Sequence, residues 1–274
     1  MIVTDFLQPD LTSIAFCWRV ERRDGVAMGF TTHDRDLEIA HLIYRAAPGM
    51  LPSAISRSDG FDVDALDVSG ALTSDAISES DLAAGRWDGA AVTMFMIDWA
   101  APEGKQLLLA RGWLGDVSAE GNGFLAELKG PTVLLDVPVV EQTSPECRAQ
   151  LGDKRCRVDM AARTRVTRVA AVIDEDVIQV ESAATAANAY GYGRLRWISG
   201  ANSGLESAVL SSAGAVLTLR EPSHFPPAAG DLVEISEGCD KRLVTCSGRF
   251  ANVPNFRGEP HLPGIDLLTR YPGA

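Results

Sequence analysis

Four of the five cysteines form two close pairs that lie far apart in the chain. Cys147 and Cys156 are separated by eight residues, and Cys239 and Cys246 by six. Such pairs are typical either of a metal site, assembled where the fold returns to one point, or of disulfides. The fifth cysteine, Cys17, lies in an apolar stretch and is expected to be a small buried hydrophobic residue.

The start of the chain bears on the choice between these two chemistries. Met1 to Asp5 show no basic region and no apolar core of the signal-peptide type. We therefore expect the protein to be made in the bacterial cytoplasm, where reducing conditions disfavour structural disulfides. A metal site made by the four paired cysteines is the preferred interpretation, and disulfides are the alternative.

The spacing of the cysteines bears on which metal they would bind. If the segment from Cys239 to Cys246 were helical, the two Cα atoms would lie ~10 Å apart along the axis. A single zinc ion needs its sulfur ligands within ~4 Å of one another, whereas a cubane cluster is wider. Both spacings also differ from the shorter spacing of zinc knuckles and from the tight runs of bacterial ferredoxins. This geometry favours an iron-sulfur cluster, and zinc remains the alternative. The spacing does not give the type of cluster, and 4Fe-4S is the form that we expect.

Basic residues gather around these cysteines, although the formal net charge of the chain is -12. Cations near thiols lower the thiol pKa and offset the charge of a thiolate-bound cluster. An ordinary solvated basic surface is the alternative. The basic neighbours are Arg148, Lys154, Arg155 and Arg157 at the first pair and Lys241, Arg242 and Arg249 at the second.

Two motifs in the second half resemble a family of bacteriophage proteins. Residues 147–156 have the pattern Cys-x-x-x-Leu-Gly-Asp-x-x-Cys. Residues 239–264 contain Cys-Asp-Lys-x-x-x-Thr-Cys, then Arg-Phe-x-Asn-x-x-Asn-Phe-Arg-Gly and His-x-Pro-Gly. These patterns resemble phage tail-tip and baseplate hub proteins, above all the hub proteins of gene transfer agents and, more distantly, the lambda tail-tip protein L. Residues 30–37 are compatible with the same family.

The resemblance implies a structural role in the tail or baseplate of a phage-like particle. In that family the four cysteines hold an iron-sulfur cluster, and here they correspond to Cys147, Cys156, Cys239 and Cys246. The resemblance also implies a homotrimer that joins the end of the tail tube to the tip protein. Its implied partners are the distal tail protein, the tip or fibre protein and the cell-wall peptidase.

Two other functions compete with the hub. The first is a metal-dependent enzyme, but the chain has no Gly-x-Ser-x-Gly, His-Glu-x-x-His, phosphate-loop or dinucleotide motif. His33 with Asp34 and Asp36 is the nearest approach to a hydrolytic site, and a polar turn explains these residues as well. The second is an electron-transfer module, which would need an exposed cluster with a reversible potential. We predict that the protein is not an enzyme.

The order of apolar and polar residues predicts a mainly β fold with a few short helices. Short β-prone runs recur along the chain between turn residues. Three prolines between Pro131 and Pro145 suit a connecting segment. We therefore expect two domains, a β-rich hub domain at 1–138 and a second at 139–274 that carries the cysteines. Antiparallel sheets and a small β-barrel are the simplest architecture for these runs.

Charge and hydropathy exclude two further roles. A net charge of -12 opposes direct binding of nucleic acid, because phosphate recognition needs a positive field. The longest apolar stretch, Ala90 to Ile97, is less than half the length of a membrane span. We expect no membrane segment and a soluble protein that becomes part of a virion.

Overall fold

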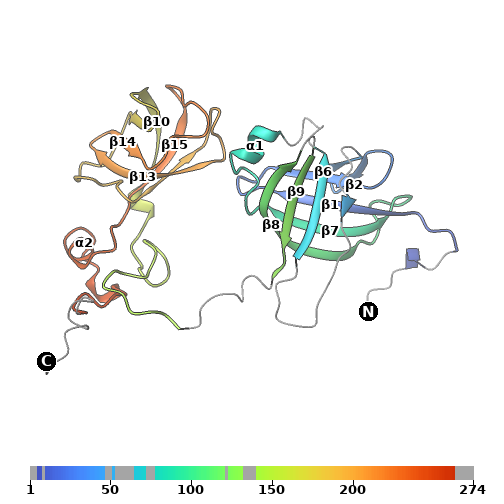
Figure 1. The fold of residues 1–274 in the computed structure, drawn as a ribbon, viewed down its shortest axis with the longest axis horizontal. Coiled ribbons are helices and arrows are strands. Elements are labelled where there is room, and N and C mark those ends of the chain that lie inside the picture. Colours follow the sequence, from blue (N-terminus) through green and yellow to red (C-terminus); the bar gives the residue numbers. More distant parts are fainter. Residues whose placement is uncertain are drawn as a thin grey trace. The chain divides into compact units, whose positions relative to one another are not determined.

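The computed structural model describes residues 5–7, 10–46, 51–52, 65–71, 78–120, 123–131 and 140–262. The chain divides into two compact units, Met1–Pro138 and Val139–Ala274. Each unit is built mainly of antiparallel strands, and the described part of the chain contains only two short α-helices (Figure 1). The predicted fold class, mainly β with two domains and a few short helices, is confirmed.

The first unit holds a nine-stranded sheet with the strand order β3-β4-β2-β1-β7-β8-β9-β6-β5. All pairs are antiparallel except β2 with β4, which is parallel. The elements are η1 (Asp5–Leu7), β1 (Ile14–Glu21), β2 (Ala27–Thr31), β3 (Leu37–Ile39), β4 (Leu42–Arg45), β5 (Leu51–Pro52), β6 (Ala65–Ala71), α1 (Glu79–Ala83), β7 (Ala91–Asp98), β8 (Leu107–Glu120) and β9 (Gly123–Lys129).

Strand β1 is buried on both faces along its middle part. Adjacent residues of a strand point to opposite faces, so Trp18 and Cys17 enter two different cores. Trp18 packs in a core with Trp87 and Met94, while Cys17 packs with Tyr44 and other side chains on the opposite face. Cys17 is fully buried, as expected, and this burial raises its thiol pKa.

Helix α1 begins where the sequence predicts a helix start. The hydroxyl of Ser78 accepts a 3.1 Å hydrogen bond from the N–H of Asp81, which satisfies one of the free donors of the first turn. Leu82 is the buried residue of the helix and joins the core that contains Trp87. The cap therefore fixes the direction in which this short helix presents its one apolar anchor to the sheet.

The second unit contains a closed six-stranded barrel with the order β10-β11-β14-β13-β12-β15. Pairing of β10 with β15, from Thr164↔Ser236 to Arg168↔Leu232, closes it. The elements of this unit are η3 (Ala161–Arg163), β10 (Thr164–Val172), β11 (Val177–Val180), β12 (Arg194–Trp197), β13 (Glu206–Ala213), β14 (Val216–Leu219), β15 (Leu232–Ser236), α2 (Leu243–Gly248) and η4 (Val253–Asn255).

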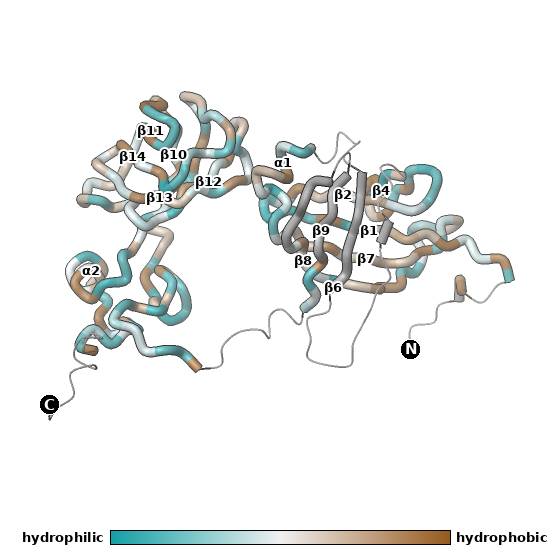
Figure 2. Tube along the Cα trace, in the orientation of Figure 1, coloured by the Kyte–Doolittle hydropathy of each residue, from teal (hydrophilic) through white to brown (hydrophobic). Residues whose placement is uncertain are grey.

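The barrel interior is filled by side chains from every strand. Hydrophobic and hydrophilic residues alternate along the strands (Figure 2), as the burial of alternate residues in β12 and β14 illustrates. Trp197 is almost completely buried, and its Nε1–H donates a 3.0 Å hydrogen bond to the hydroxyl of Ser207. The small-barrel prediction is confirmed. One cysteine-bearing segment precedes β10 and the other follows β15, so the pairing of these two strands positions both segments.

The sequence predicts strands at the apolar run from Leu37 to Tyr44 and at the alternating run from Phe61 to Val68. The first differs from the structure, and the second lies partly outside the described residues. The run from Leu37 to Tyr44 is split into β3 and β4 because Ala40 and His41 have positive φ values of 48° and 64°, which turn the chain back. The alternating acidic run that begins at Phe61 lies outside the described residues up to residue 64. Within the described residues, no helix has both the length and the apolar character that crossing a bilayer requires.

Candidate metal centre

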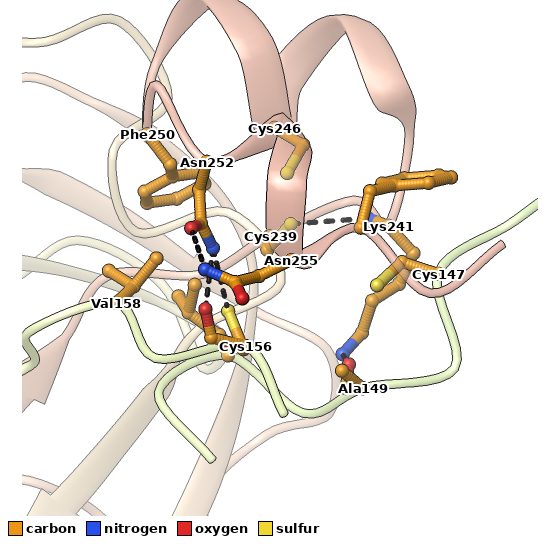
Figure 3. A pocket seen from close by; sticks show the side chains of 12 residues that line it. Cys147, Ala149, Cys156, Val158, Cys239, Lys241, Cys246, Phe250, Asn252 and Asn255 are labelled. Carbon is orange, nitrogen blue, oxygen red and sulfur yellow. Dashed lines mark hydrogen bonds between the residues drawn. The ribbon is translucent and has the colours of Figure 1, made fainter. Parts of the chain in front are cut away.

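All four paired cysteines line one pocket in the second unit. Cys147 and Cys156 lie in the segment before η3, Cys239 follows β15, and Cys246 lies in α2. Figure 3 shows the four side chains around a common space between these segments. The fold thus brings together two pairs of thiols that are about 90 residues apart in the chain. A hydrogen bond between Lys241 and Ala149, which are 92 positions apart, joins the two segments.

The segment from Cys239 to Cys246 is not a continuous helix. Helix α2 begins only at Leu243, and Lys241 has a positive φ of 64°, which an α-helix does not allow. Asp240 fixes this entry, because its carboxylate accepts hydrogen bonds from the N–H of Arg242 at 3.0 Å and the hydroxyl of Thr245 at 2.9 Å. The separation of ~10 Å expected for two cysteines on one helix therefore does not apply.

Lys241 joins the two cysteine-bearing segments. Its carbonyl accepts a 2.9 Å hydrogen bond from the N–H of Cys147, and its Nζ donates to the carbonyl of Ala149. Its own N–H points at the sulfur of Cys239, at 3.4 Å. Lys241 therefore positions Cys147 and Cys239 relative to each other through its backbone, while its side chain binds the segment that carries Cys147.

N–H groups also approach two other sulfur atoms. The backbone N–H of Arg257 lies 3.3 Å from Cys147 Sγ, and Nδ2 of Asn252 lies 3.6 Å from Cys156 Sγ. Asn252 Nδ2 also donates to the carbonyl of Cys156 at 2.6 Å, and its Oδ1 accepts from Asn255 at 2.7 Å, so the amide is oriented. Such donors stabilise a charged thiolate. Sequence reasoning did not assign a role to Asn252, although the motif that contains it was visible.

The first cysteine pair is held by a tight turn around Asp153. Its carboxylate accepts hydrogen bonds from the N–H groups of Gln150, Arg155 and Cys156, at 3.0, 2.8 and 2.6 Å. The bond from Cys156 is the main cause of a lowered Asp153 pKa. Gly152, with a φ of 81°, allows this turn, and Met160 packs directly above it.

The basic residues around the site mostly contact carboxylates and carbonyl groups. Arg148 binds Glu259 with two hydrogen bonds of 2.6 and 2.9 Å, and also contacts Glu141 at 3.2 Å. These contacts lower the pKa of Glu259 to about 2 and raise the pKa of Arg148 above its usual value. Glu141 also pairs with Arg155, and its pKa is lowered.

The expectation that basic neighbours depress the cysteine pKa values is wrong for Cys239 and Cys246. Burial raises the pKa of the Cys239 thiol and exceeds the opposing effects of the Lys241 N–H and charge. Burial also raises the pKa of Cys246, and the other three thiolates of the site raise it further. Both effects favour the neutral thiol, and ionised thiolates this close together would repel one another unless a bound cation offset their charge.

Arg249 anchors the cysteine-bearing segment on the barrel. Its guanidinium donates to the carbonyl of Gly238 at 3.1 Å, to the carbonyl of Ala189 and to Glu237 at 2.7 Å. Glu237 also accepts from Arg163 at 2.8 Å, and both arginines lie over the ring of Phe250. Because Phe250 lines the pocket, this cluster connects the site directly with residues at the ends of β10 and β15.

The donor set suits a soft metal centre. All five cysteines are free thiols. Four of them line the pocket, together with apolar side chains such as Val158 and Phe256 and with no histidine or carboxylate. Thiolates favour zinc or iron-sulfur clusters. Among the described residues, no group of three or more metal-binding side chains is placed to hold a single ion.

His33 is part of a turn. Its Nδ1 accepts a 3.1 Å hydrogen bond from the N–H of Arg35, and its ring lies 5.0 Å from that of Trp99. Asp36 accepts from the N–H of Ala46 at 2.9 Å. Asp36 therefore stabilises the backbone beside β3, while Asp34 lies 3.2 Å from His33 Nδ1, and both contacts agree with the polar-turn interpretation.

Comparisons with known proteins identify the family. Residues 3–159 match the family model described as "Baseplate hub protein, N-terminal attachment domain", and residues 188–266 match "Phage conserved hypothetical protein BR0599". One solved structure, "Virion of native gene transfer agent (GTA) particle", contains a chain that is 38% identical. The alignment covers 99% of this chain and 95% of that one, with a TM-score of 0.85. No curated protein matches the chain. The matches indicate a structural protein and not an enzyme, and the chain belongs to the family of baseplate hub proteins.

Proposed function

We propose that this protein is the hub subunit at the distal end of a phage-like tail, in a gene transfer agent or a siphophage. The observation that carries the proposal is the similarity to a virion chain over nearly the full length of both. In this role the protein joins the end of the tail tube to the tip or fibre protein, and works as a homotrimer. The distal tail protein and the cell-wall peptidase are its other partners.

Within that hub, Cys147, Cys156, Cys239 and Cys246 hold a 4Fe-4S cluster that fastens two segments of the second unit. Three features support this assignment: the shared pocket, the all-sulfur donor set and the N–H groups near three of the sulfur atoms. The cluster would stabilise the fold, because a metal that binds only the folded site adds its binding energy to folding. Zinc is the second candidate.

Metal analysis tests the cluster directly. Protein purified without oxygen is expected to be brown and to contain about four iron atoms and four sulfides per chain, as a 4Fe-4S cluster on four cysteines requires. Colourless protein with one zinc per chain would assign the site to zinc. Folded protein with four free thiols at the site and no metal would refute the cluster.

The hub role is tested separately in particles. Antibodies against the chain, or mass spectrometry of purified particles, should find it at the distal tail end in a multiple of three copies. Deletion of residues 250–264 should leave the first unit folded and stop tail completion, as counted in micrographs. Finished tails without the protein would rule out the hub.

A further inference from the structure

We infer that the first unit carries a docking face for an acidic segment of another tail protein, on the part of its sheet that no other described residues cover. The inference rests on the proposed hub function. The face consists of two cross-strand rows on β1, β7, β8 and β9. Glu21 pairs with Ala91, Ala91 with Trp113, and Trp113 with Lys129. Two residues further along the same face, Arg19 pairs with Thr93, and Thr93 with Arg111.

The same sheet face is covered at its other end. Beyond Arg19, Cys17 and Phe95 are buried beneath Leu37 and Tyr44 of β3 and β4. The opposite face carries the core around Trp87. The rows from Arg19 and Glu21 onward receive no such cover among the described residues. Arg19, Glu21 and Arg111 are exposed, and Trp113 remains 36% exposed.

The composition of this face is that of a protein interface. Trp and Arg are the side chains that most often dominate binding energy. A depression of about 640 Å³ lies at the end of the face, between Arg23, Gly89 and Trp113. The small residue Ala91 lines it, and the side chain of Lys129 lies over Gly115. The guanidinium of Arg23 lies over Gly89, where an added Cβ would come within 2.5 Å of it.

The charges of the face select an acidic partner. Arg19 is paired with Glu21, and Arg22 with Asp24. Among the described residues no carboxylate forms an ion pair with Arg23 or Arg111. Two unpaired arginines beside an exposed tryptophan, in a chain of net charge -12, make a local positive site for carboxylates.

Nucleic acid is the less favoured ligand for this face. Glu21 and Asp88 also line the depression and would repel phosphates, and the charge of the whole chain opposes DNA as well. A protein segment can avoid these two carboxylates while its own acidic groups reach Arg23 and Arg111. The matched family model describes this part of the chain as an attachment domain, which agrees with a protein partner.

Charge reversal tests the face in whole particles. The double variant Arg23→Glu with Arg111→Glu should fold with an unchanged melting temperature, because both side chains are exposed and unpaired. It should assemble into particles at least about tenfold less well, as expected when two charge contacts are reversed. Arg220→Glu, an exposed arginine of the barrel, is the matched control and should assemble as the wild type does. Equal assembly of all three proteins would overturn the inference.

A photocrosslinking residue in place of Arg111 identifies the occupant. We expect a crosslink to a carboxylate-rich segment of a different protein in particles purified from the producing bacterium. A crosslink to a second copy of this chain, or none in finished particles, would overturn the inference. So would binding of a single-stranded DNA probe that the double variant abolishes. Absence of the wild-type chain from particles would instead refute the hub function itself.

Discussion

Arg148 and Glu259 lie 111 positions apart and form a pair of parallel hydrogen bonds, 2.6 and 2.9 Å long. Glu259 also accepts from the N–H of Ser144 at 2.9 Å, and its own N–H donates to the Ser144 carbonyl at 2.8 Å. Arg148 adjoins Cys147, whose sulfur faces the N–H of Arg257. This pair therefore ties the last part of the chain to the first cysteine-bearing segment independently of any metal.

The pairing of Arg148 with Glu259 predicts how stability changes at low pH. Arg148 lowers the folded-state pKa of Glu259 from 4.5 to about 2. Because the folded pKa is depressed, the contribution of Glu259 to stability is present above pH 4.5 and is lost as the pH falls from about 4.5 towards 2. An NMR titration of the Glu259 carboxyl should find a pKa close to 2 in the wild type and one nearer 4.5 in Arg148→Gln. Arg194→Gln, which removes an exposed ion pair on the barrel, is the control and should leave Glu259 unchanged. A wild-type value near 4.5 would contradict the pairing.

The cysteines give a prediction about stability. Cys239→Ser should destabilise the second unit, by up to ~10 kcal/mol if the thiol binds a structural metal, and should leave the first unit folded. Cys17→Ala is the matched control, because Cys17 is buried in the first unit and faces Thr31. Limited proteolysis with mass spectrometry can follow the two units separately. Equal resistance of both units in Cys239→Ser would exclude a stabilising metal at this thiol.

The local features of this fold were predictable from sequence, whereas the details of the site were not. The hairpin of β1 and β2 and the Ser78 cap depend on neighbouring residues, so periodicity and capping rules identify them. The break at Lys241 depends on a positive φ, which a lysine rarely adopts and which the sequence therefore does not predict. The pairing of Arg148 with Glu259 depends on tertiary folding across 111 positions, and only the structure reveals it.

Basic residues near the thiols illustrate the same limit. Their number suggests depressed cysteine pKa values, but burial of the thiols and the direction of the basic side chains oppose this effect. Arg148 and Arg155 point to carboxylates, and Arg249 points to the barrel. Burial is the main cause of the raised pKa values of Cys246 and of the half-buried Cys239. Composition can therefore locate a site without giving its electrostatics.

Gly152 offers a test of the turn that carries the first cysteine pair. Gly152→Ala should destabilise the second unit more than Gly214→Ala does. Both glycines have positive φ values, 81° and 59°, so both variants lose ~1 kcal/mol or more from the backbone. Only at Gly152 would the new Cβ also collide with a side chain, at 2.2 Å from Met160 Cγ, whereas nothing lies within 4 Å at Gly214. Thermal unfolding of the two variants measures the difference, and equal melting temperatures would show that Met160 moves aside freely.

The last prediction concerns Asn252, whose amide contacts both the carbonyl and the sulfur of Cys156. If the site holds an iron-sulfur cluster, N–H groups that face its sulfur ligands favour the more negative, reduced state. Asn252→Leu should therefore lower the reduction potential by about 40 mV, the equivalent of ~1 kcal/mol for one electron.

Asn255→Ala provides the matched comparison, because it removes the 2.7 Å bond that orients the Asn252 amide and leaves the donor itself in place. Its potential should fall by less than that of Asn252→Leu. Iron content, measured in the same samples, separates tuning from loss of the site: variants that keep their iron and shift only in potential support a direct N–H contact to sulfur. Loss of iron in Asn252→Leu with rescue by Asn252→Gln would instead show that the amide is needed to hold the Cys156 loop, and an unchanged potential at full iron content would exclude the contact.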